Sequence, residues 1–518
     1  MAAWCGRRFA ACGATGRFAT TLGVLAVALA AAAGGASATT QNFVDDEFNR
    51  SGALGLIRAQ YAYQYGYTGK GVLLAILDTG LDVHHPEFAG RISPWRMNFV
   101  PGFHELDVSD VEPSGSIIGH GTHVAGLAAA ARDGVGMHGV AYNATVLPLR
   151  TGFAAHELAH AYERVFYSGA KVLNGSYGPL VMAPTHFEDP SHPRYRQSNP
   201  GFVRQDHAVF TEWTMAQADY LKQLAEADVL MVFAAGNDRQ FQPGDYSASP
   251  AGLGLLPLIT PANTAAGTFY KVMDPEFDYD RYDPATWTLL SNSDPALLSE
   301  DNSSLQGALI AVVATRPDGE IAIYSNWCGF AKAWCLAAPG GGTGEAEHTR
   351  PLLSTLPYSS YGPMQGTSMA SPVVAGAAAV LREAFPYMSA RQIIEVILTT
   401  ANSGGIWADS NIYGHGMLDL GRAVRGPAVF GESGFPSVFS VDTRGYSSLW
   451  SNDISGSGGL AKAGAGVLTM TGNNSYTGAT TIRGGKLVVN GSIANSALLT
   501  IGKDAALGGS GIVGNTRV

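Results

Sequence analysis

Short, almost wholly apolar runs alternate with helical patterns between about residues 67 and 424. Runs such as "GVLLAILDTG" (71–80), "AKVLNGSYG" (170–178), "DVLMVFAAGN" (228–237) and "ALIAVVAT" (308–315) are typical of strands that are buried on both faces. The segments between them, "GTHVAGLAAAA" and "AHELAHAYERVFYSG" among them, are typical of helices. This alternation predicts an α/β domain with a mainly parallel sheet flanked by helices. In such a sheet, functional sites lie at the carboxyl ends of the strands.

A different composition begins after about Gly426, where Gly, Ser, Asn and Thr dominate. The stretch "GVLTMTGNNSYTGATTIRGGKLVVNGSI" (466–493) contains short strands separated by Gly-rich turns. Even spacing of this kind predicts the start of a β-solenoid repeat region, and a flexible low-complexity linker is the alternative. The alternating Val, Leu and Ile residues favour the solenoid. The pattern stops in mid-repeat at Val518, so we expect residues 426–518 to hold a linker and an incomplete set of repeats.

The N-terminus has the features of a secretory signal peptide. Three arginines precede an apolar stretch at residues 22–33, and small residues ending in Ala-Ser-Ala follow at 36–38. A membrane anchor is the alternative, but residues 22–38 are fewer than the roughly 20 apolar residues that a span needs. We therefore expect residues 1–38 to be a signal peptide and residues 39–425 to be the α/β domain.

Two of the four cysteines would leave with the signal peptide, which leaves Cys328 and Cys335 in "SNWCGFAKAWC". In an exported chain, two cysteines this close suggest a disulfide. A metal site is the alternative, but it needs more ligands than two thiols, and no histidine is nearby. We expect the disulfide, no metal site and no cofactor.

The charge and the two interruptions of the pattern limit the possible partners. The net charge of −10 argues against a general nucleic-acid binder. The stretch 179–211 is rich in Pro and His, and the stretch from Asp274 onward is acidic, so we interpret both as surface loops. Clustered acids can bind calcium, but no spaced ligand motif supports it here, and a solvated loop is the simpler interpretation.

Three polar residues share a chemical theme. Asp78 ends a predicted strand, while His120 and Ser368 each begin a predicted helix, so all three could meet at one edge of the sheet. Acyl transfer needs a nucleophile, a base and a carboxylate that orients the base. Each residue taken alone has a simpler explanation: a turn for Asp78, a cap or a buried polar group for His120, and a helix N-cap for Ser368.

The segments around these residues, "ILDTGLDVHHPEF", "GHGTHVAGLAAA" and "GTSMASPVVAG", resemble those of the subtilisin-like serine proteases in the same order. The resemblance covers roughly residues 60–425. It implies that Asp78 is the orienting acid, that His120 is the base and that Ser368 is the nucleophile. It also implies that His123, the second histidine of "HGTH", is not the base.

Two further segments resemble substrate-binding parts of this family. "AAGND" (234–238) implies that Asn237 supplies an oxyanion-hole amide, together with the backbone N–H of Ser368, and that Ala235 and Gly236 contact substrate.

"NGSYGP" (174–179) resembles the strand with which a substrate peptide pairs. This implies that Ser176, Tyr177 and Gly178 line the pocket for a substrate side chain.

The C-terminal repeats resemble the passenger strands of autotransporters, so the order of signal, protease and repeat is similar to that of the autotransporter subtilases. This implies an exported protein, extracellular or on the surface of a Gram-negative bacterium. We expect protein or peptide substrates and no nucleic acid, with outer-membrane association only through a barrel that is missing from this sequence.

The sequence thus predicts a secreted serine endopeptidase that forms an acyl-enzyme and matures or degrades surface or extracellular proteins. The alternative is an adhesin-like binding passenger whose protease domain is inactive, although all three triad positions are intact. A lipase or esterase is disfavoured, because its Gly-x-Ser-x-Gly elbow is absent: Met369 and Ala370 follow Ser368.

Overall fold

The computed structural model describes residues 42–112, 114–178, 208–239, 249–250, 252–265, 269–272, 288–289 and 299–518. The predicted signal peptide lies outside these residues, as does most of each predicted surface loop. Contrary to the prediction, the described parts of these two stretches are not simple loops. Strand β5 (Ala208–Thr211) comes from the first stretch and β8 (Thr288–Leu289) from the second, and both flank β7 (Phe269–Val272) in a small sheet.

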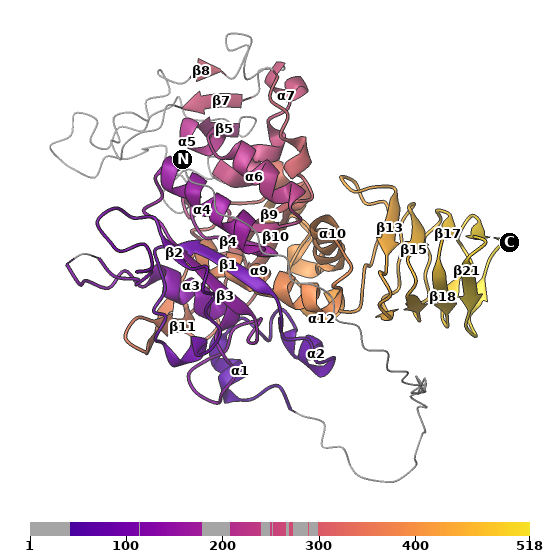
Figure 1. The fold of residues 1–518 in the computed structure, drawn as a ribbon, viewed down its shortest axis with the longest axis horizontal. Helices are drawn as coiled ribbons and strands as arrows, with labels where there is room; N and C mark the ends of the chain where they lie inside the picture. Colours follow the sequence, from indigo (N-terminus) through magenta and orange to yellow (C-terminus); the bar gives the residue numbers. More distant parts are fainter. Residues whose placement is uncertain are drawn as a thin grey trace, which may run out of the picture. The chain divides into compact units, whose positions relative to one another are not determined.

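A seven-stranded, wholly parallel sheet forms the centre of the α/β region (Figure 1). The strand order is β10-β9-β6-β4-β1-β3-β2. Its strands have the bounds β1 (Leu73–Asp78), β2 (Met97–Asn98), β3 (Thr145–Arg150), β4 (Val172–Gly175), β6 (Leu230–Ala234), β9 (Leu309–Thr315) and β10 (Cys335–Pro339).

Helices cover both faces of this sheet. Successive side chains of a strand point to opposite faces, so each strand contributes to two hydrophobic clusters that the helices bury. Leu74 and Ile76 of β1 pack in the cluster that includes α3 (His120–Ala129), α9 (Thr367–Ala384) and α10 (Ala390–Thr400). Ala75 and Leu77 face the opposite cluster, with α4 (Ala155–Ser168) and α6 (Ala218–Glu226). Burial on both faces explains why the strands are apolar throughout.

The small residues of α9 allow it to lie unusually close to its neighbours. A Cβ added at Gly376 would lie 2.8 Å from the backbone oxygen of Ala128 in α3. The same helix packs against β4, β6, β9 and β10. The run of Ala, Val and Gly therefore places the start of α9 beside the carboxyl ends of the strands.

The remaining helices and strands before the repeats are short. The helices are α1 (Asp46–Ser51), α2 (Ala59–Gln64), α5 (Glu212–Met215), α7 (Pro261–Ala265), α11 (Ser410–Tyr413) and α12 (Leu420–Ala423). A hairpin of β11 (Leu352–Leu356) and β12 (Ser360–Met364) leads into α9.

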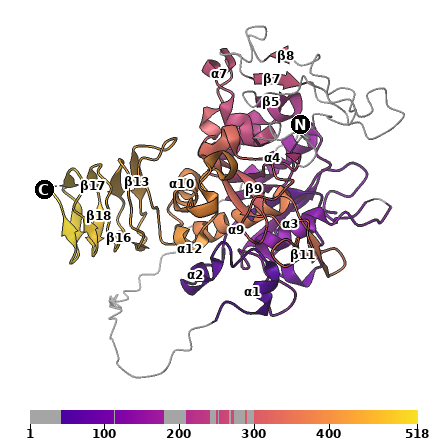
Figure 2. The ribbon, with the colours of Figure 1, turned by 180° about the vertical axis from the view of Figure 1, so that it is seen from behind.

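The C-terminal region is a parallel β-solenoid with a turn of about 20 residues: Leu460 pairs with Thr480, which pairs with Leu499 (Figures 1 and 2). The predicted start of a solenoid is confirmed. One sheet contains β13 (Val438–Asp442), β15 (Gly459–Ala463), β17 (Thr480–Ile482), β20 (Leu499–Ile501) and β23 (Thr516–Arg517). The others contain β14 (Ser448–Trp450), β16 (Val467–Met470), β18 (Gly485–Val489) and β21 (Ala505–Gly508), and β19 (Ser492–Ile493) with β22 (Ile512–Val513).

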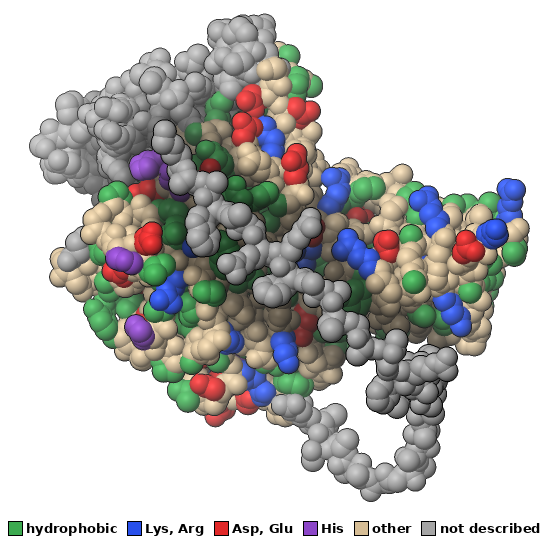
Figure 3. Space-filling model, viewed as in Figure 1, with side chains coloured by type: hydrophobic (Ala, Val, Ile, Leu, Met, Phe, Trp, Pro, Cys, Tyr) green, Lys and Arg blue, Asp and Glu red, His purple; other side chains and the backbone are tan. Residues whose placement is uncertain are grey.

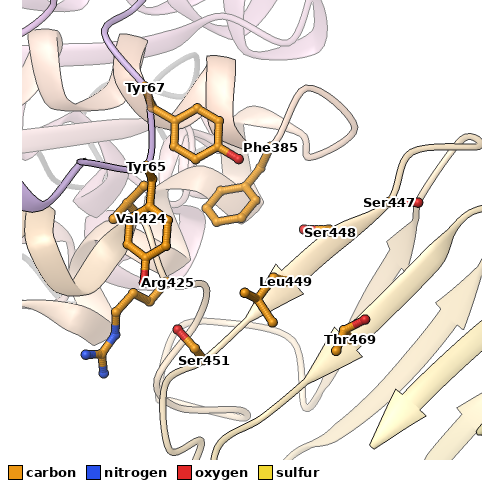
Figure 4. A pocket seen from close by; sticks show the side chains of 10 residues that line it. All are labelled: Tyr65, Tyr67, Phe385, Val424, Arg425, Ser447, Ser448, Leu449, Ser451 and Thr469. Atoms are coloured by element: carbon orange, nitrogen blue, oxygen red, sulfur yellow. The ribbon is translucent and has the colours of Figure 1, made fainter. Parts of the chain in front are cut away.

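The first solenoid turn packs directly on the α/β region. Trp450 is fully buried, its indole N–H donates to the Tyr387 hydroxyl (3.2 Å), and that hydroxyl donates to Ser448 Oγ (2.7 Å). Beside this contact is a hollow of about 300 Å³ (Figure 4). Its walls come from both regions: Tyr65, Tyr67, Phe385, Val424 and Arg425 on one side, and Ser447, Ser448, Leu449, Ser451 and Thr469 on the other.

Two surface properties bear on partners. On the face seen in Figure 3, acidic and basic side chains of the described residues are interspersed, and neither sign forms a continuous patch there. Within the described ranges, no helix combines the length and apolar character needed to cross a bilayer.

Candidate active site

Asp78 and His120 form a direct contact at the carboxyl edge of the sheet. Asp78 is the last residue of β1 and is fully buried, and His120 Nδ1 lies 2.6 Å from its Oδ1. Burial lowers the pKa of His120, but the charge of Asp78 and this hydrogen bond outweigh it, so the pKa is raised overall. A neutral His120 with its proton on Nδ1 has a free acceptor at Nε2, and its side chain is 32% exposed.

Glycines make this contact possible by letting α3 begin against the turn after β1. A Cβ at Gly121 would lie 2.2 Å from the backbone oxygen of Gly80. Gly80 itself has a φ of +135° and lies against the backbone of residues 108–110. The glycines flanking Asp78 and His120 are therefore required by the close approach of the two segments.

Ser368 lies in the first turn of α9, where its backbone N–H has no intrahelical acceptor. Pro372, four residues later, has no N–H to donate to the Ser368 carbonyl. The Ser176 hydroxyl donates to that carbonyl instead (2.8 Å). The Ser368 hydroxyl makes no capping bond; it donates to the Ser176 carbonyl (3.2 Å).

The strand order places the Ser368 segment beside the Asp78–His120 pair. Ser176 follows Gly175 of β4, and Gly175 pairs with Leu77, which immediately precedes Asp78. Ser368 is bonded to Ser176 on both its hydroxyl and its carbonyl. No hydrogen bond joins the Ser368 hydroxyl to His120 in this described part of the chain. Such bonds are often long in an enzyme without substrate and tighten only when substrate binds.

Asn237 lies in the turn after β6, and its amide has a defined orientation. Its Oδ1 accepts from the backbone N–H of Thr367 (2.8 Å) and from the Thr367 hydroxyl (3.0 Å). Since a backbone N–H can only donate, this contact identifies the amide oxygen and leaves Nδ2 as a donor. The Thr367 hydroxyl also accepts from the N–H of Gly236 (3.1 Å).

The predicted substrate-pocket residues have different environments. Ser176 is buried in the network described above, and Ala235 is fully buried. The Tyr177 hydroxyl lies 2.8 Å from that of Tyr162, and its ring packs against Phe153 at 5.1 Å, so the side chain is held in an aromatic cluster. Gly178 is exposed, with open space where a Cβ would be.

A second carboxylate near His120 was not among the residues singled out from the sequence. Asp110 accepts from the Thr79 hydroxyl (2.7 Å) and from the N–H of Thr122 (2.7 Å). The Thr79 hydroxyl in turn accepts from the N–H of Gly121 (2.9 Å). Asp110 lies in an irregular loop with no periodic pattern, so the sequence contained no signal for it. Thr79 and Thr367 lie within the motifs of Asp78 and Ser368. Their position next to these residues is the sequence signal that could have identified them as part of the site.

His123 is isolated from this chemistry. It is fully buried, and its Nε2 lies 3.1 Å from the carbonyl oxygens of both Leu352 and Gly362. Burial lowers its pKa to about 3, so it is neutral and holds the hairpin against α3.

Cys328 and Cys335 form a disulfide across the 3₁₀ helix Gly329–Trp334, with Cα atoms 5.7 Å apart. Among the residues that the structure describes, no group of three or more His, Cys, Asp and Glu side chains is arranged to hold a metal ion.

The parallel sheet, the polar cluster at its carboxyl edge and the helix that begins with Thr367-Ser368 together define a serine-protease architecture. The subtilase family model matches residues 69–416, and the chain belongs to this family. The model of the passenger-associated transport repeat matches residues 460–489, within the solenoid. The predicted family, fold and enzyme class, a serine protease of the subtilisin type with an autotransporter-type repeat, are confirmed.

Curated relatives include an extracellular protease and an autotransporter. The chain is 31% identical over 519 residues to an extracellular serine protease of Serratia marcescens, covering 91% of this chain and 46% of the relative. It is 28% identical over 490 residues to the Neisserial autotransporter lipoprotein NalP of Neisseria meningitidis, covering 84% of this chain and 40% of the relative. The chain spans about half the length of these relatives.

Proposed function

We propose that this protein is an exported serine endopeptidase in which Asp78, His120 and Ser368 form the catalytic triad and Asn237 supplies an oxyanion donor. The observation that carries the proposal is the 2.6 Å contact between Asp78 and His120, with Ser368 tied to the neighbouring strand through Ser176. These contacts support a site in which the three residue types that acyl transfer requires act together at one edge of the sheet.

The proposed reaction begins with rotation of the Ser368 hydroxyl from the Ser176 carbonyl toward His120 Nε2. His120 takes the hydroxyl proton as Oγ attacks the peptide carbonyl, and Asp78 stabilises the imidazolium that forms. Asn237 Nδ2 and the Ser368 N–H donate to the oxyanion. His120 then protonates the leaving amine, and a water molecule activated by the same histidine hydrolyses the acyl-enzyme.

The same rotation provides a place for substrate. Once Ser368 Oγ leaves it, the Ser176 carbonyl is a free acceptor for a backbone N–H of an extended peptide. Exposed Gly178 has no side chain to obstruct a strand that adds at this edge. We assign Ser176, Tyr177, Gly178 and Gly236 to the substrate-binding wall, with Tyr177 shaping it from a fixed position in its aromatic cluster. Ala235 is fully buried and supports this wall from behind.

The proposal extends to the location of the protein and to its domain limits, and the repeat and the relatives support the location. A passenger-associated repeat follows the protease, and relatives are named as extracellular or as an autotransporter. The protein is therefore assigned to the cell surface or the medium, where it matures or degrades proteins. Residues 1–38 are the signal peptide, 39–425 the peptidase domain and 426–518 the linker and repeats.

The test compares two serines that lie at helix starts. Ser389 is a true N-cap, since its hydroxyl accepts from the N–H of Gln392 (3.3 Å), whereas Ser368 caps nothing. In the full chain, Ser368→Ala should abolish casein hydrolysis and labelling by a serine-directed phosphonate, with an unchanged melting curve. Ser389→Ala should lose about 1 kcal/mol of stability and keep both activities. A folded wild-type chain that neither hydrolyses casein nor reacts with the phosphonate would instead support a binding passenger.

A further inference from the structure

The turn that carries Asn237 is held from behind by a second asparagine, Asn326. This residue is 3% exposed and lies in the segment that follows β9. Its backbone N–H donates to the carbonyl of Gly236 (3.0 Å), and its Nδ2 donates to the carbonyl of Ala235 (3.0 Å). Its Oδ1 accepts from the N–H of Asp238 (3.1 Å), and Nδ2 also approaches the Asp238 carboxylate (3.2 Å).

These four contacts reach the residues on both sides of Asn237 and leave the Asn237 side chain itself untouched. On the opposite side, Thr367 bonds the amide oxygen of Asn237 and the N–H of Gly236. The turn is thus clamped between the start of α9, which carries Ser368, and Asn326. We infer that Asn326 is a positioning residue for the oxyanion hole: it fixes the turn so that Asn237 Nδ2 points to where negative charge develops. This inference rests on the proposed function of the site.

Holding this turn in one conformation matters because an oxyanion donor stabilises the transition state only if it is already in place when the negative charge forms. A misplacement of about 1 Å is enough to cost about 100-fold in rate. The turn itself has no regular secondary structure after β6 ends at Ala234, and Gly236 has a φ of +103°. A flexible turn of this kind needs contacts from outside to hold one conformation.

An asparagine side chain suits this position because it both donates and accepts. Aspartate has the same volume and retains the acceptor for the Asp238 N–H, but it cannot donate to the Ala235 carbonyl. It would also place a second carboxylate against the buried Asp238. Alanine would remove all three side-chain contacts and keep only the backbone bond to Gly236.

The experiment measures kcat and KM for a peptide substrate, and the inhibition constant of a peptide aldehyde, which forms a tetrahedral adduct with the serine. For Asn326→Ala in the full chain we expect kcat to fall about 10- to 100-fold, KM to change less than about threefold, and the aldehyde to weaken in parallel with kcat. Asn326→Asp preserves the side-chain volume and should show the same changes in kcat, KM and inhibition. It replaces the alanine variant in the experiment if that variant melts below the assay temperature.

The matched control is Asn452→Ala. Asn452 is equally buried, at 1% exposure, and its amide also bonds backbone carbonyls, those of Arg422 (3.0 Å) and Gly426 (2.5 Å), but it lies at the solenoid junction. It should lower the melting temperature and leave kcat unchanged, which separates loss of positioning from loss of stability.

A double-mutant cycle decides whether Asn326 acts through Asn237. Asn237→Ala alone should lower kcat about 10²- to 10³-fold, the established cost of losing this donor in the family. If Asn326 only positions Asn237, adding Asn326→Ala to that variant should lower kcat no further. The inference is overturned if both Asn326 variants have a normal kcat, or if the losses in the double variant are fully additive. In either case, turnover by the wild type still supports the proposed function. A wild-type chain without Ser368-dependent turnover overturns both.

Discussion

The α/β region and the β-solenoid are both built from parallel strands, but the residues in contact are separated by different lengths of chain in the two regions. In the solenoid, each strand pairs with the strand about 20 residues later, and some side-chain contacts have the same spacing: Asn474 Oδ1 accepts from the N–H of Ile454, 20 positions away. In the α/β region, the contacts of the site join residues 42, 130 and 192 positions apart. Chemistry is concentrated where crossovers bring distant segments together, and the solenoid repeats one local arrangement.

The two regions also differ in how completely they satisfy buried polar groups. In the solenoid, Lys462 is fully buried, and its ammonium donates to the carbonyls of Gly464, Gly466 and Gly484 at 2.7, 2.7 and 2.8 Å. At the site, by contrast, Asp78 Oδ2 has no hydrogen-bond partner within the described part of the protein. Full hydrogen bonding of buried polar groups stabilises the solenoid, whereas the α/β region retains buried polar atoms without a described partner, Asp78 Oδ2 among them.

The largest contrast should come from the two histidines of "HGTH". His120→Ala removes the proposed base, so kcat should fall about 10⁶-fold with little change in melting temperature. His123→Ala removes a buried side chain that bonds the hairpin, so it should lower the melting temperature and reduce kcat far less. Steady-state kinetics and thermal melts on both variants decide this, and the reverse pattern would mean that the base is His123.

Next in size is Asp78→Asn, which should lower kcat about 10⁴-fold because the wrong tautomer of His120 is favoured. Only neutral His120 can act as base, so wild-type activity is lost as pH falls through its raised pKa. Without the charge of Asp78 that pKa falls, and the acidic limb of the pH–rate profile should move to lower pH, although Asp110 remains nearby. A limb that does not move would show that Asp78 does not control this pKa.

The third prediction tests whether the two regions are independent. Trp450→Ala empties a fully buried site against Phe439 and Tyr387, so it should cost about 3–5 kcal/mol of stability. The proposed triad lies outside the solenoid, so kcat at low temperature should be retained. A chain cut after Arg425 should retain it too. Denaturant unfolding with parallel activity assays tests this. Loss of activity in a folded, truncated chain would mean that the repeats complete the active site.

Within the solenoid, Lys462→Met should cost about 3 kcal/mol, because three buried or half-buried carbonyls lose their donor. Lys486→Met is the matched control: this lysine is exposed in β18, and its loss should change stability by less than about 0.5 kcal/mol. Hydrogen exchange should locate the added opening in the solenoid turns and not in the central sheet. Equal stability of the two variants would show that the buried ammonium contributes nothing.

The smallest effect concerns Glu395 of α10, which is 2% exposed and has one carboxylate oxygen without a partner in the described structure. Burial raises its pKa to about 8. The native state therefore retains a proton that the unfolded chain releases above about pH 4.5, so stability should fall as pH rises from about 5 to 8. Glu395→Gln should flatten this slope and be on the order of 1 kcal/mol more stable than wild type at pH 8. Melting curves across that pH range, showing the same slope for both proteins, would contradict the assignment.

The sequence alone was enough to predict the parallel sheet, the solenoid and the side chains at the strand and helix ends. Apolar periodicity reports burial directly, and the motifs around Asp78, His120 and Ser368 are local. It did not predict the small sheet that contains β5, because nothing in a Pro-rich stretch indicates its pairing partners.

Tertiary structure decided which backbone and side-chain groups meet. That Pro372 frees the Ser368 carbonyl for Ser176, that Asp110 reaches Thr79, and that Asn326 clamps the turn around Asn237 all depend on segments joined by crossovers in the sheet. A hydrogen bond between residues some 90 or 190 positions apart leaves no periodic trace in either segment, because each segment's pattern records only what is buried and not what it is buried against.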